Sequence, residues 1–396
     1  MTPSASAPLL SAAVVDTGTP PIPEAQAWVA RYDGRHGPLI NLAQAVPDRP
    51  PPAPFMGRLA EAAADAEATR YGPILGDTQL REAYARHATG LYGGRLAPEN
   101  VAITAGCNMA FAAALMLVAK AGDQVILPAP WYFNHQMWAS MLGVAVRALP
   151  CRADAGFVPS PDDAERLVDG RTKALVLVTP NNPTGAVYPP ATIAAFADLC
   201  RRRGLWLVID ETYRDFLPPG MGRPHALFED ERWRANVIGL YSFSKAYGIP
   251  GYRLGAMIAD ALVVAELAKI LDTVQICPPR AGQVPVAWGI DGLATWREEN
   301  RRALHRRAEA FRRVLRQCPD WRLDSIGAYF AYVRHPFGAA PAAAVAEALA
   351  VERGLLALPG SYFGPDQDAH LRMAFANVEA ATIEAIADRL RGFILP

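Results

Sequence analysis

The chain has 396 residues, 51% hydrophobic and 20% charged, a composition typical of a folded protein large enough for two domains. Lys plus Arg and Asp plus Glu each total 39, so no net charge favours nucleic acid or an anionic membrane as a partner. Residues 1–20 lack a basic segment followed by a continuous apolar core, and we therefore expect no signal peptide. The longest apolar run, residues 109–119, is too short to cross a bilayer and predicts a buried helix.

The five cysteines lie far apart, without a Cys-x-x-Cys pair or a histidine at metal-binding spacing. This spacing argues against a metal site and against a disulfide framework. A reducing compartment suits separate thiols, so we expect a cytoplasmic protein.

The N-terminal part alternates turn-rich and helical segments. Residues 1–35 are rich in Pro, Ala, Ser and Thr, and predict a loose arm that ends in a helix near residues 24–32. A Pro-rich connector through Pro54 follows, and turn residues at 70–76 interrupt the next helical pattern. Two further helices are expected here, over residues 61–69 and 80–91.

From Val101 onward, short apolar runs alternate with helical segments. Such alternation predicts βαβ units and a mostly parallel sheet covered by helices on both faces. The predicted strands are residues 101–104, 124–127, 144–149, 173–179, 206–209, 237–241 and 254–258. The predicted helices are residues 109–121, 134–142, 162–168 and 191–203.

The C-terminal part predicts a long helix and then a smaller α+β domain, with which we expect the N-terminal segment to pack. Residues 284–317 carry many arginines interleaved with glutamates, which we interpret as a solvated helix face rather than an RNA-binding surface. The expected strands are residues 329–333, 355–358 and 371–375, and the helices are 342–353 and 381–393. The predicted organisation is an N-terminal arm and helix over 1–40, a large α/β domain over 41–285 and a small α+β domain over 286–396.

One stretch, residues 241–255, places Lys245 between two apolar runs. Burial lowers the pKa of a lysine, and an amine made less basic is the kind of nucleophile that forms a Schiff base with a carbonyl. Ser242, Ser244 and Arg253 supply donors suited to a phosphate. A carbonyl and a phosphate on one ligand suggest pyridoxal 5'-phosphate (PLP). A surface loop with a solvated lysine is the alternative.

Ligands gather at the carboxyl ends of strands in open α/β sheets, and two predicted strands end in suitable turns. Gly106, Cys107 and Asn108 lead into a helix whose N-terminus could bind an anion, although a routine tight turn has the same pattern. The turn at residues 128–133 could present an aromatic ring to a planar ligand, or simply contribute to the core.

Two more predicted strands end in polar side chains. Asn182 precedes a proline, which favours an extended backbone and would fix its amide toward a ligand, unless the segment is a plain turn. Asp210 ends an apolar strand with no basic neighbour in sequence, which is costly unless it meets a cation such as a pyridinium nitrogen. Tyr213 could reach the phenolic oxygen of the same ring. Together these strand ends indicate a cofactor site.

These motifs resemble the class I/II aminotransferases of PLP fold type I, from about residue 40 to the C-terminus. The motifs are N-N-P-T-G at 181–185, D-E-T-Y at 210–213, S-F-S-K-x7-R at 242–253, R-Y-G-P-x-x-G at 70–76, G-C-N at 106–108 and R-M-A-F-A at 372–376. The resemblance implies an α/β fold, with a mostly parallel sheet flanked by helices as the large domain. The C-terminal part and the N-terminal segment would form the smaller α+β domain.

The resemblance also implies a role for each site residue. Lys245 would form the internal aldimine and Asp210 would keep the pyridine nitrogen protonated. Asn182 and Tyr213 would hydrogen-bond the phenolic oxygen, and Tyr132 would stack on the ring, with Trp131 as the less favoured candidate. The implied phosphate ligands are Gly106, Cys107, Asn108, Ser242, Ser244 and Arg253. Arg372 would clamp the substrate α-carboxylate, and Asn182 and Ala45 would also belong to the substrate site. Tyr71 would reach the neighbouring subunit's phosphate, which implies a homodimer.

The chain departs from the family pattern at three places. Ala45 stands where the family usually has glycine, which narrows the space beside the substrate, and Cys107-Asn108 is an uncommon pair in the phosphate loop. Relatives selective for dicarboxylic amino acids place an arginine shortly before the segment matching residues 276–279, where this chain has Asp272 and no arginine. Aspartate is therefore disfavoured as the substrate, unless Arg280 or a residue elsewhere substitutes.

We predict a transaminase that acts on an amino acid and a 2-oxo acid by a ping-pong cycle, with Lys245 moving a proton from Cα to the C4' carbon of the cofactor. The nearest alternative is a β- or γ-elimination or a cyclisation on the same fold. A cofactor-binding regulator is disfavoured, because the chain begins in a short arm without an appended DNA-binding segment. No G-x-G-x-x-G follows the early strands, which argues against NAD.

Overall fold

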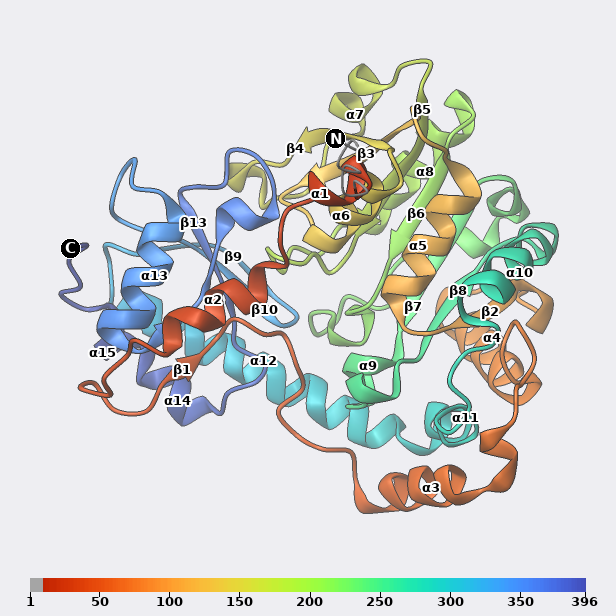
Figure 1. Cartoon of the computed structure of the whole chain (residues 1–396), viewed down its shortest axis with the longest axis horizontal. Helices are drawn as coiled ribbons and strands as arrows, with labels where there is room; N and C mark the ends of the chain where they lie inside the picture. The colour runs from red at the N-terminus through yellow and green to blue at the C-terminus, as the bar shows by residue number, and fades with distance from the viewer. Residues whose placement is uncertain (1–9) are drawn as a thin grey trace, which may run out of the picture.

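A seven-stranded sheet forms the centre of the computed structural model, which describes residues 10–396. The strand order is β2-β8-β7-β6-β5-β3-β4, and β8 alone runs antiparallel to its neighbours in this sheet (Figure 1). The strands are β2 (Val101–Thr104), β3 (Gln124–Ala129), β4 (Ala145–Pro150), β5 (Thr172–Val178), β6 (Trp206–Asp210), β7 (Val237–Ser242) and β8 (Gly255–Ile258). The predicted α/β fold with a mostly parallel sheet is confirmed.

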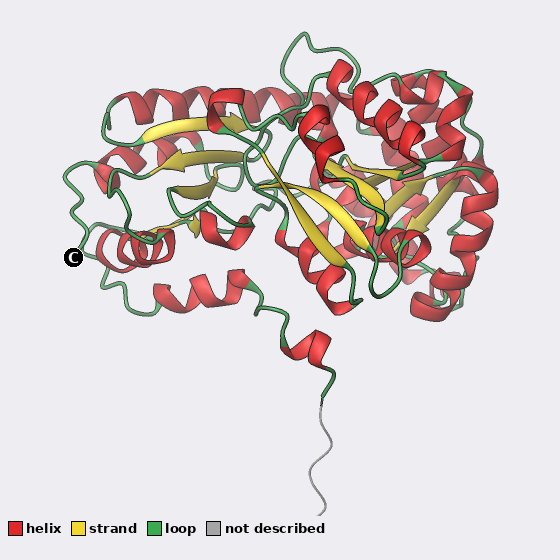
Figure 2. Cartoon of the chain, turned by 90° about the horizontal axis from the view of Figure 1, so that it is seen from above, coloured by secondary structure: helices red, strands yellow, loops and turns green. Residues whose placement is uncertain are grey.

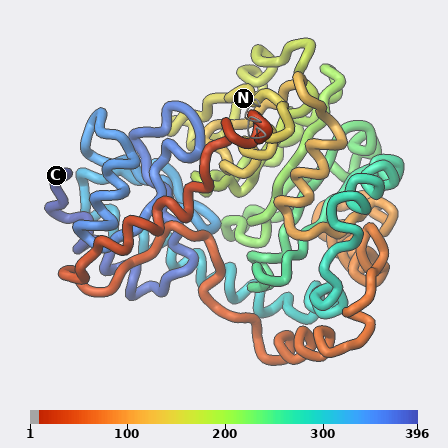
Figure 3. The backbone as a smooth tube through the Cα atoms, viewed as in Figure 1, coloured from red at the N-terminus to blue at the C-terminus, as the bar shows by residue number. Residues whose placement is uncertain are grey.

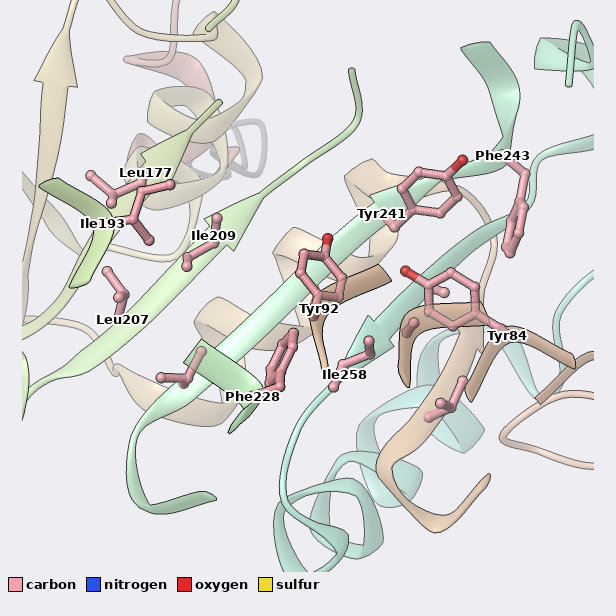
Figure 4. Close-up of a cluster of buried hydrophobic side chains, with 14 of the residues drawn as sticks. Tyr84, Tyr92, Leu177, Ile193, Leu207, Ile209, Phe228, Tyr241, Phe243 and Ile258 are labelled. Carbon is pink, nitrogen blue, oxygen red and sulfur yellow. The ribbon is translucent and has the colours of Figure 1, made fainter. Parts of the chain in front are cut away.

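Helices cover both faces of this sheet, because its central strands are apolar on both sides and must be shielded from water. The helices of this larger unit are α3 (Ala53–Ala64), which packs on α11, α4 (Thr78–Tyr92), α5 (Cys107–Val118), α6 (Phe133–Met141), α7 (Pro161–Leu167), α8 (Pro190–Arg203), α9 (Phe243–Ala246), α10 (Ala261–Gln275) and α11 (Gln283–Gly292). Figure 4 shows one of the resulting cores, where Tyr84 and Tyr92 of α4 pack beside Tyr241 of β7.

The smaller unit contains a four-stranded antiparallel sheet in the order β12-β13-β10-β9. Its elements are α12 (Ala294–Arg316), β9 (Arg322–Gly327), β10 (Phe330–Arg334), α13 (Ala342–Arg353), β11 (Leu355–Leu356), β12 (Leu358–Pro359), β13 (His370–Ala374), α14 (Ala380–Glu384) and α15 (Ile386–Leu390). In Figure 2 these strands lie between helices, beside the larger sheet. The domain bounds given above remain a prediction.

The N-terminal segment packs with the smaller unit, as the sequence suggests. Strand β1 (Ile40–Asn41) pairs in parallel with β11, and α2 (Pro21–Val29) lies against α13. The preceding turn of helix, α1 (Ala12–Val15), instead contacts α6 of the larger unit. The chain therefore crosses from one unit to the other between α1 and α2 (Figure 3).

Several local predictions differ from the structure. Helix α10 was not predicted, although Asp260 caps it by accepting a hydrogen bond from the Leu262 N–H at 3.0 Å. The long C-terminal helix is two helices, α11 and α12, which meet at Leu293. Strand β9 was also missed, and α3 begins at Ala53 inside the Pro-rich connector, because proline is tolerated in a first helical turn.

The arginine-rich face of α12 is only partly solvated. Arg307 is buried, where it pairs with Asp48 and donates to the Ala376 carbonyl at 2.6 Å. The Arg297 guanidinium lies 3.1 Å from the Asp215 carboxylate, and both side chains are largely buried. The prediction of a fully solvated face is therefore wrong at these two positions, where arginines hold α12 against its neighbours. No helix within residues 10–396 is long and apolar enough to span a bilayer.

Candidate active site

A pocket of about 260 Å³ lies where the carboxyl ends of β5, β6 and β7 face the smaller unit. Val178, Asp210 and Ser242 reach it from these strands, and Arg372 reaches it from β13. Every predicted site residue lines the pocket except Tyr71 and Gly106, and Gly106 directly precedes the lining residue Cys107. The predicted residues that line it are Ala45, Cys107, Asn108, Tyr132, Asn182, Asp210, Tyr213, Ser242, Ser244, Lys245, Arg253 and Arg372.

Lys245 is the one lysine of the described chain that lines this pocket. It lies on α9, whose first turn is capped by the Ser242 hydroxyl, and its Nζ donates to the Ala45 carbonyl at 2.6 Å. Burial, together with the nearby charges of Arg372 and Arg253, lowers the pKa of Lys245 to about 8. About a tenth of this amine is therefore neutral and nucleophilic at pH 7, far more than for an ordinary lysine.

A pH prediction follows from the lowered pKa of Lys245. The rate at which the cofactor-free protein takes up pyridoxal 5'-phosphate depends on the neutral amine, so it should rise with pH and level off above about 8. Arg372→Leu removes a nearby positive charge and should move this midpoint to higher pH. The change in absorbance after mixing, followed from pH 6 to 10, measures the pH dependence of this rate in the unmodified protein and in the variant. A rate that keeps rising to pH 10 in the unmodified protein would contradict the assignment.

Asp210 is almost fully buried at the end of β6 and receives several hydrogen bonds. Its Oδ1 accepts from the Thr212 N–H at 3.0 Å and the Thr212 hydroxyl at 2.7 Å, and its Oδ2 lies 3.3 Å from His135 Nε2. Burial alone would raise the pKa of Asp210, but the hydrogen bonds from His135 and Thr212 outweigh it and hold the pKa below its usual value. The carboxylate is therefore an anion facing the pocket, ready to pair with a cationic ligand atom.

His135 and Thr212 are site residues that the sequence analysis missed. The His135 ring is buried, stacks on Phe111 at 3.8 Å between centroids, and meets the edge of Tyr132 at 5.2 Å. The signal that could have found it is its position three residues after Tyr132 at the start of a helix, which places both side chains on one face. Through these contacts one helix positions both an aromatic ring and the Asp210 carboxylate.

Arg372 is a buried cation with no carboxylate partner in the described chain. It donates to the Asn182 Oδ1 at 3.1 Å and to the Ala43 carbonyl, and its Nε has no partner. The guanidinium lies 5.2 Å from the Phe330 ring and 5.0 Å from the Phe363 ring, and burial lowers its pKa to about 10. A buried arginine held by neutral groups is unfavourable until an anion binds, so this position suits a ligand carboxylate.

A second anion position is formed where α5 begins. Gly106 has a φ of +84°, and a Cβ there would lie 2.3 Å from Nη2 of Arg253. A Cβ on Gly255 would meet the Cys107 backbone nitrogen at 2.7 Å. These glycines let the first N–H groups of a helix, the Ser242 and Ser244 hydroxyls and a guanidinium converge, a donor set that suits a phosphate.

Gly106→Ala tests this second anion position. The added methyl group would strain a positive φ and displace the Arg253 guanidinium, so we expect affinity for pyridoxal 5'-phosphate to fall by roughly 10- to 100-fold. Equilibrium dialysis measures the dissociation constant of the cofactor. Gly122→Ala is the matched control, because Gly122 also has a positive φ but no atom near its added Cβ. Equal losses in the two variants would refute a local effect on the anion position.

Tyr71 lies outside its own pocket, with 79% of its surface exposed. Tyr213 is buried against Tyr329 and Phe330, with ring centroids 5.2 and 5.1 Å away, and the Tyr132 hydroxyl lies 3.4 Å from Asn108 Oδ1. The roles predicted for these residues remain predictions, since each depends on a ligand or a second subunit.

Fold type I PLP enzymes have one antiparallel strand in an otherwise parallel sheet. A lysine, an aspartate and donors suited to a phosphate lie at the carboxyl edge of that sheet. Residues 29–390 match the family model described as aminotransferase class I and II, and the chain belongs to this family. It is 28% identical over 360 residues to an aromatic aminotransferase of Arabidopsis thaliana, with 89% of each chain covered. It is also 29% identical over 340 residues to an arginine–pyruvate transaminase of Pseudomonas aeruginosa, with 85% of each chain covered.

Among solved structures, the chain is similar to the aspartate aminotransferase of Thermus thermophilus with maleate. The TM-score is 0.88 at 25% identity, and the match covers 97% of this chain and 99% of the other. The protein is thus an aminotransferase of fold type I, and the predicted transaminase is favoured over the elimination alternative. The family uses pyridoxal 5'-phosphate, and the carboxylate, amine and anion position of the pocket fit the pyridine nitrogen, the carbonyl and the phosphate of that molecule.

Proposed function

We propose that the protein moves an amino group between an L-amino acid and a 2-oxo acid by a ping-pong cycle, with pyridoxal 5'-phosphate held at Lys245. The observation that carries the proposal is one pocket lined by a lysine of lowered pKa, an anionic aspartate and an unpaired arginine (Lys245, Asp210 and Arg372). Each of these groups is costly to bury alone, and each has a counterpart in the cofactor or in an amino acid.

When bound, the cofactor supplies an electron sink for the charge that develops at the substrate Cα. Asp210, held anionic by His135 and Thr212, would keep a proton on the pyridine nitrogen. Asn182 and Tyr213 would bind the phenolic oxygen, and Tyr132 would stack on the ring. The phosphate would lie against Gly106, Cys107, Asn108, Ser242, Ser244 and Arg253.

The remaining groups would act on the substrate. Arg372, oriented by its hydrogen bond to Asn182, would bind the α-carboxylate. Its planar guanidinium can donate two parallel hydrogen bonds to a carboxylate, which a lysine cannot do. The Lys245 Nζ would accept the proton from the substrate Cα and deliver it to the C4' carbon of the cofactor. Its lowered pKa places the amine near the pH at which one group serves as both base and acid.

The proposal includes a homodimer in a cytoplasmic setting. Tyr71 and Ile276 are large side chains that are 79% and 44% exposed, and Ile276 also has a positive φ of 62°. Such exposed side chains suit an interface better than a solvent-exposed surface. Tyr71 would contribute to the phosphate site of the second subunit. Five free thiols in the described chain favour a reducing compartment.

Transfer of labelled nitrogen tests the proposed function. The holoenzyme is incubated with a ¹⁵N-labelled L-amino acid and an unlabelled 2-oxo acid, and label should appear in the newly formed amino acid. Initial rates against both substrates should give parallel double-reciprocal lines. Release of ammonia without any need for the 2-oxo acid would refute the proposal and support elimination.

A further inference from the structure

The part of the pocket wall that no cofactor role explains is predominantly apolar. It consists of Ile22, Ala45, Val46, Phe133, Val178 and Pro250, with Gln44 as the one polar side chain. From this wall we infer that the amino acid taken by the enzyme has an uncharged, apolar side chain, and that Ile22 and Val46 recognise it. The inference rests on the proposed function and adds the class of substrate.

The charged groups that line the pocket are all accounted for. Its cations in the described chain are Lys245, Arg253 and Arg372, which serve the carbonyl, the phosphate and the α-carboxylate. Its carboxylate in the same part of the chain is Asp210, which is engaged by His135 and Thr212. Within the described residues of one subunit, neither a second substrate carboxylate nor a basic side chain would find a free partner in this pocket.

Arg280, the alternative cation for a dicarboxylic substrate, is engaged elsewhere. Its Nη1 donates to the Glu67 carbonyl at 2.7 Å, and its Nη2 lies 3.7 Å from the Asp77 carboxylate. The guanidinium also packs against Gly72, where a Cβ would lie 2.9 Å from Arg280 Nε. Arg280 therefore holds the 67–77 segment in place and does not line its own pocket.

Ile22 is held at the mouth of the pocket by the rest of α2. Ala25 and Trp28, on the face of this helix toward the smaller unit, are buried in the core, and α2 packs on α13. The chain just before Ile22 crosses from α1, which contacts α6, to α2. Figure 1 shows α1 beside the larger unit and α2 beside the smaller one. Ile22, near the start of α2, is partly buried and lines the pocket.

Val46 belongs to a loop that is fixed to two of the proposed catalytic and substrate-binding groups. The Ala43 carbonyl accepts from Arg372, and the Ala45 carbonyl accepts from Lys245 at 2.6 Å. A tight turn follows, in which the Val46 N–H donates to the Gln44 carbonyl at 3.1 Å. This loop is hydrogen-bonded to Arg372 and Lys245, the groups proposed to hold the α-carboxylate and to carry the proton. The Val46 side chain therefore has a defined position beside the substrate.

The expected selectivity is large, because an unpaired carboxylate against an apolar wall is far less favourable than a methyl group. We expect kcat/KM for leucine, methionine or phenylalanine to exceed that for aspartate by at least ~100-fold. The experiment mixes the wild-type holoenzyme with single amino acids and follows the change in cofactor absorbance. Aspartate or arginine as the best donor would overturn the inference and leave the proposed function standing, whereas no reaction with any amino acid would refute the proposed function itself.

Substitutions at Ile22 separate recognition from a general loss of structure. Ile22→Ala should raise KM for leucine roughly 10-fold with little change in kcat, and should change alanine turnover much less. Ile22→Arg should raise the ratio of aspartate to leucine turnover by at least about 10-fold, since it supplies the missing cation. Equal losses for leucine and alanine in Ile22→Ala, or an unchanged ratio in Ile22→Arg, would overturn the role of Ile22.

Two control variants complete the test. Gln26 is exposed one turn after Ile22 on α2 and does not line the pocket, so Gln26→Ala should leave every kcat/KM value within about twofold. Arg280→Ala should leave the ratio of aspartate to leucine turnover unchanged. A selective loss of aspartate turnover in Arg280→Ala would show that this arginine binds a second carboxylate in the assembled enzyme, and would contradict the inference.

Discussion

Lys245→Ala is expected to lower kcat by at least ~10⁴-fold, the largest effect of any single substitution in this chain. The variant loses the amine that attaches the cofactor and the group that moves the Cα proton, and no other lysine of the described chain lines the pocket to replace it. The visible absorbance of the bound cofactor should change at the same time. Steady-state turnover with a fixed donor and acceptor, together with the spectrum of the purified variant, measures both effects.

Lys269→Ala is the matched control for this prediction. Lys269 is exposed on α10 and pairs with Glu266 at 2.7 Å, an interaction worth at most about 1 kcal/mol. The turnover and the spectrum of the Lys269→Ala variant should match those of the unmodified protein. A Lys245→Ala variant with turnover within tenfold of the unmodified enzyme would refute the proposed role of Lys245.

Asp210→Asn should lower kcat by roughly 10³-fold and weaken cofactor binding. A neutral amide of the same shape cannot hold a proton on the pyridine nitrogen, so the electron sink would be much less effective. The amide keeps one oxygen that can accept from Thr212, but it replaces the oxygen that faces His135 with an NH2 donor. The measurement is kcat with the cofactor at saturating concentration, which separates the loss of chemistry from the loss of affinity.

His135→Phe tests whether the contact between His135 and Asp210 is needed to keep the Asp210 carboxylate ionised. The substitution keeps a ring against Phe111 but removes the nitrogen 3.3 Å from the carboxylate, so Asp210 should become easier to protonate. We expect a decline in kcat at low pH that begins at a higher pH than in the unmodified enzyme. Asp154→Asn, at an exposed ion pair far from the site, should change nothing. An Asp210→Asn variant as active as Asp154→Asn would contradict the account.

Much of the site could be predicted from the sequence, for a geometric reason. The carboxyl ends of parallel strands meet at one edge of a sheet, so Asp210 and the residues after β5 and β7 converge once the strand pattern is recognised. The apolar runs that form these strands are long and bounded by turn residues, which made their positions clear. Lys245 could be singled out because a lysine between buried strands is costly without a function.

Other features depended on tertiary packing that no local pattern contains. His135 became a neighbour of Asp210 only because α6 packs beside α5, and Ile22 reached the pocket only because α2 docks on the distant α13. Arg297 and Arg307 look like solvated charges in sequence, yet their partners Asp215 and Asp48 lie far away along the chain. Helix α10 has a clear cap at Asp260 and was overlooked, although its sequence carries the signal.

The position at which the cofactor is attached to the chain can be measured directly. Reduction of the holoenzyme with borohydride fixes the pyridoxyl group to the nitrogen that holds it, and peptide mass spectrometry then locates it among the four lysines of the chain. We predict one pyridoxyl group per chain, on Lys245. A pyridoxyl group on Lys120, Lys173 or Lys269, or none on any lysine, would contradict the account.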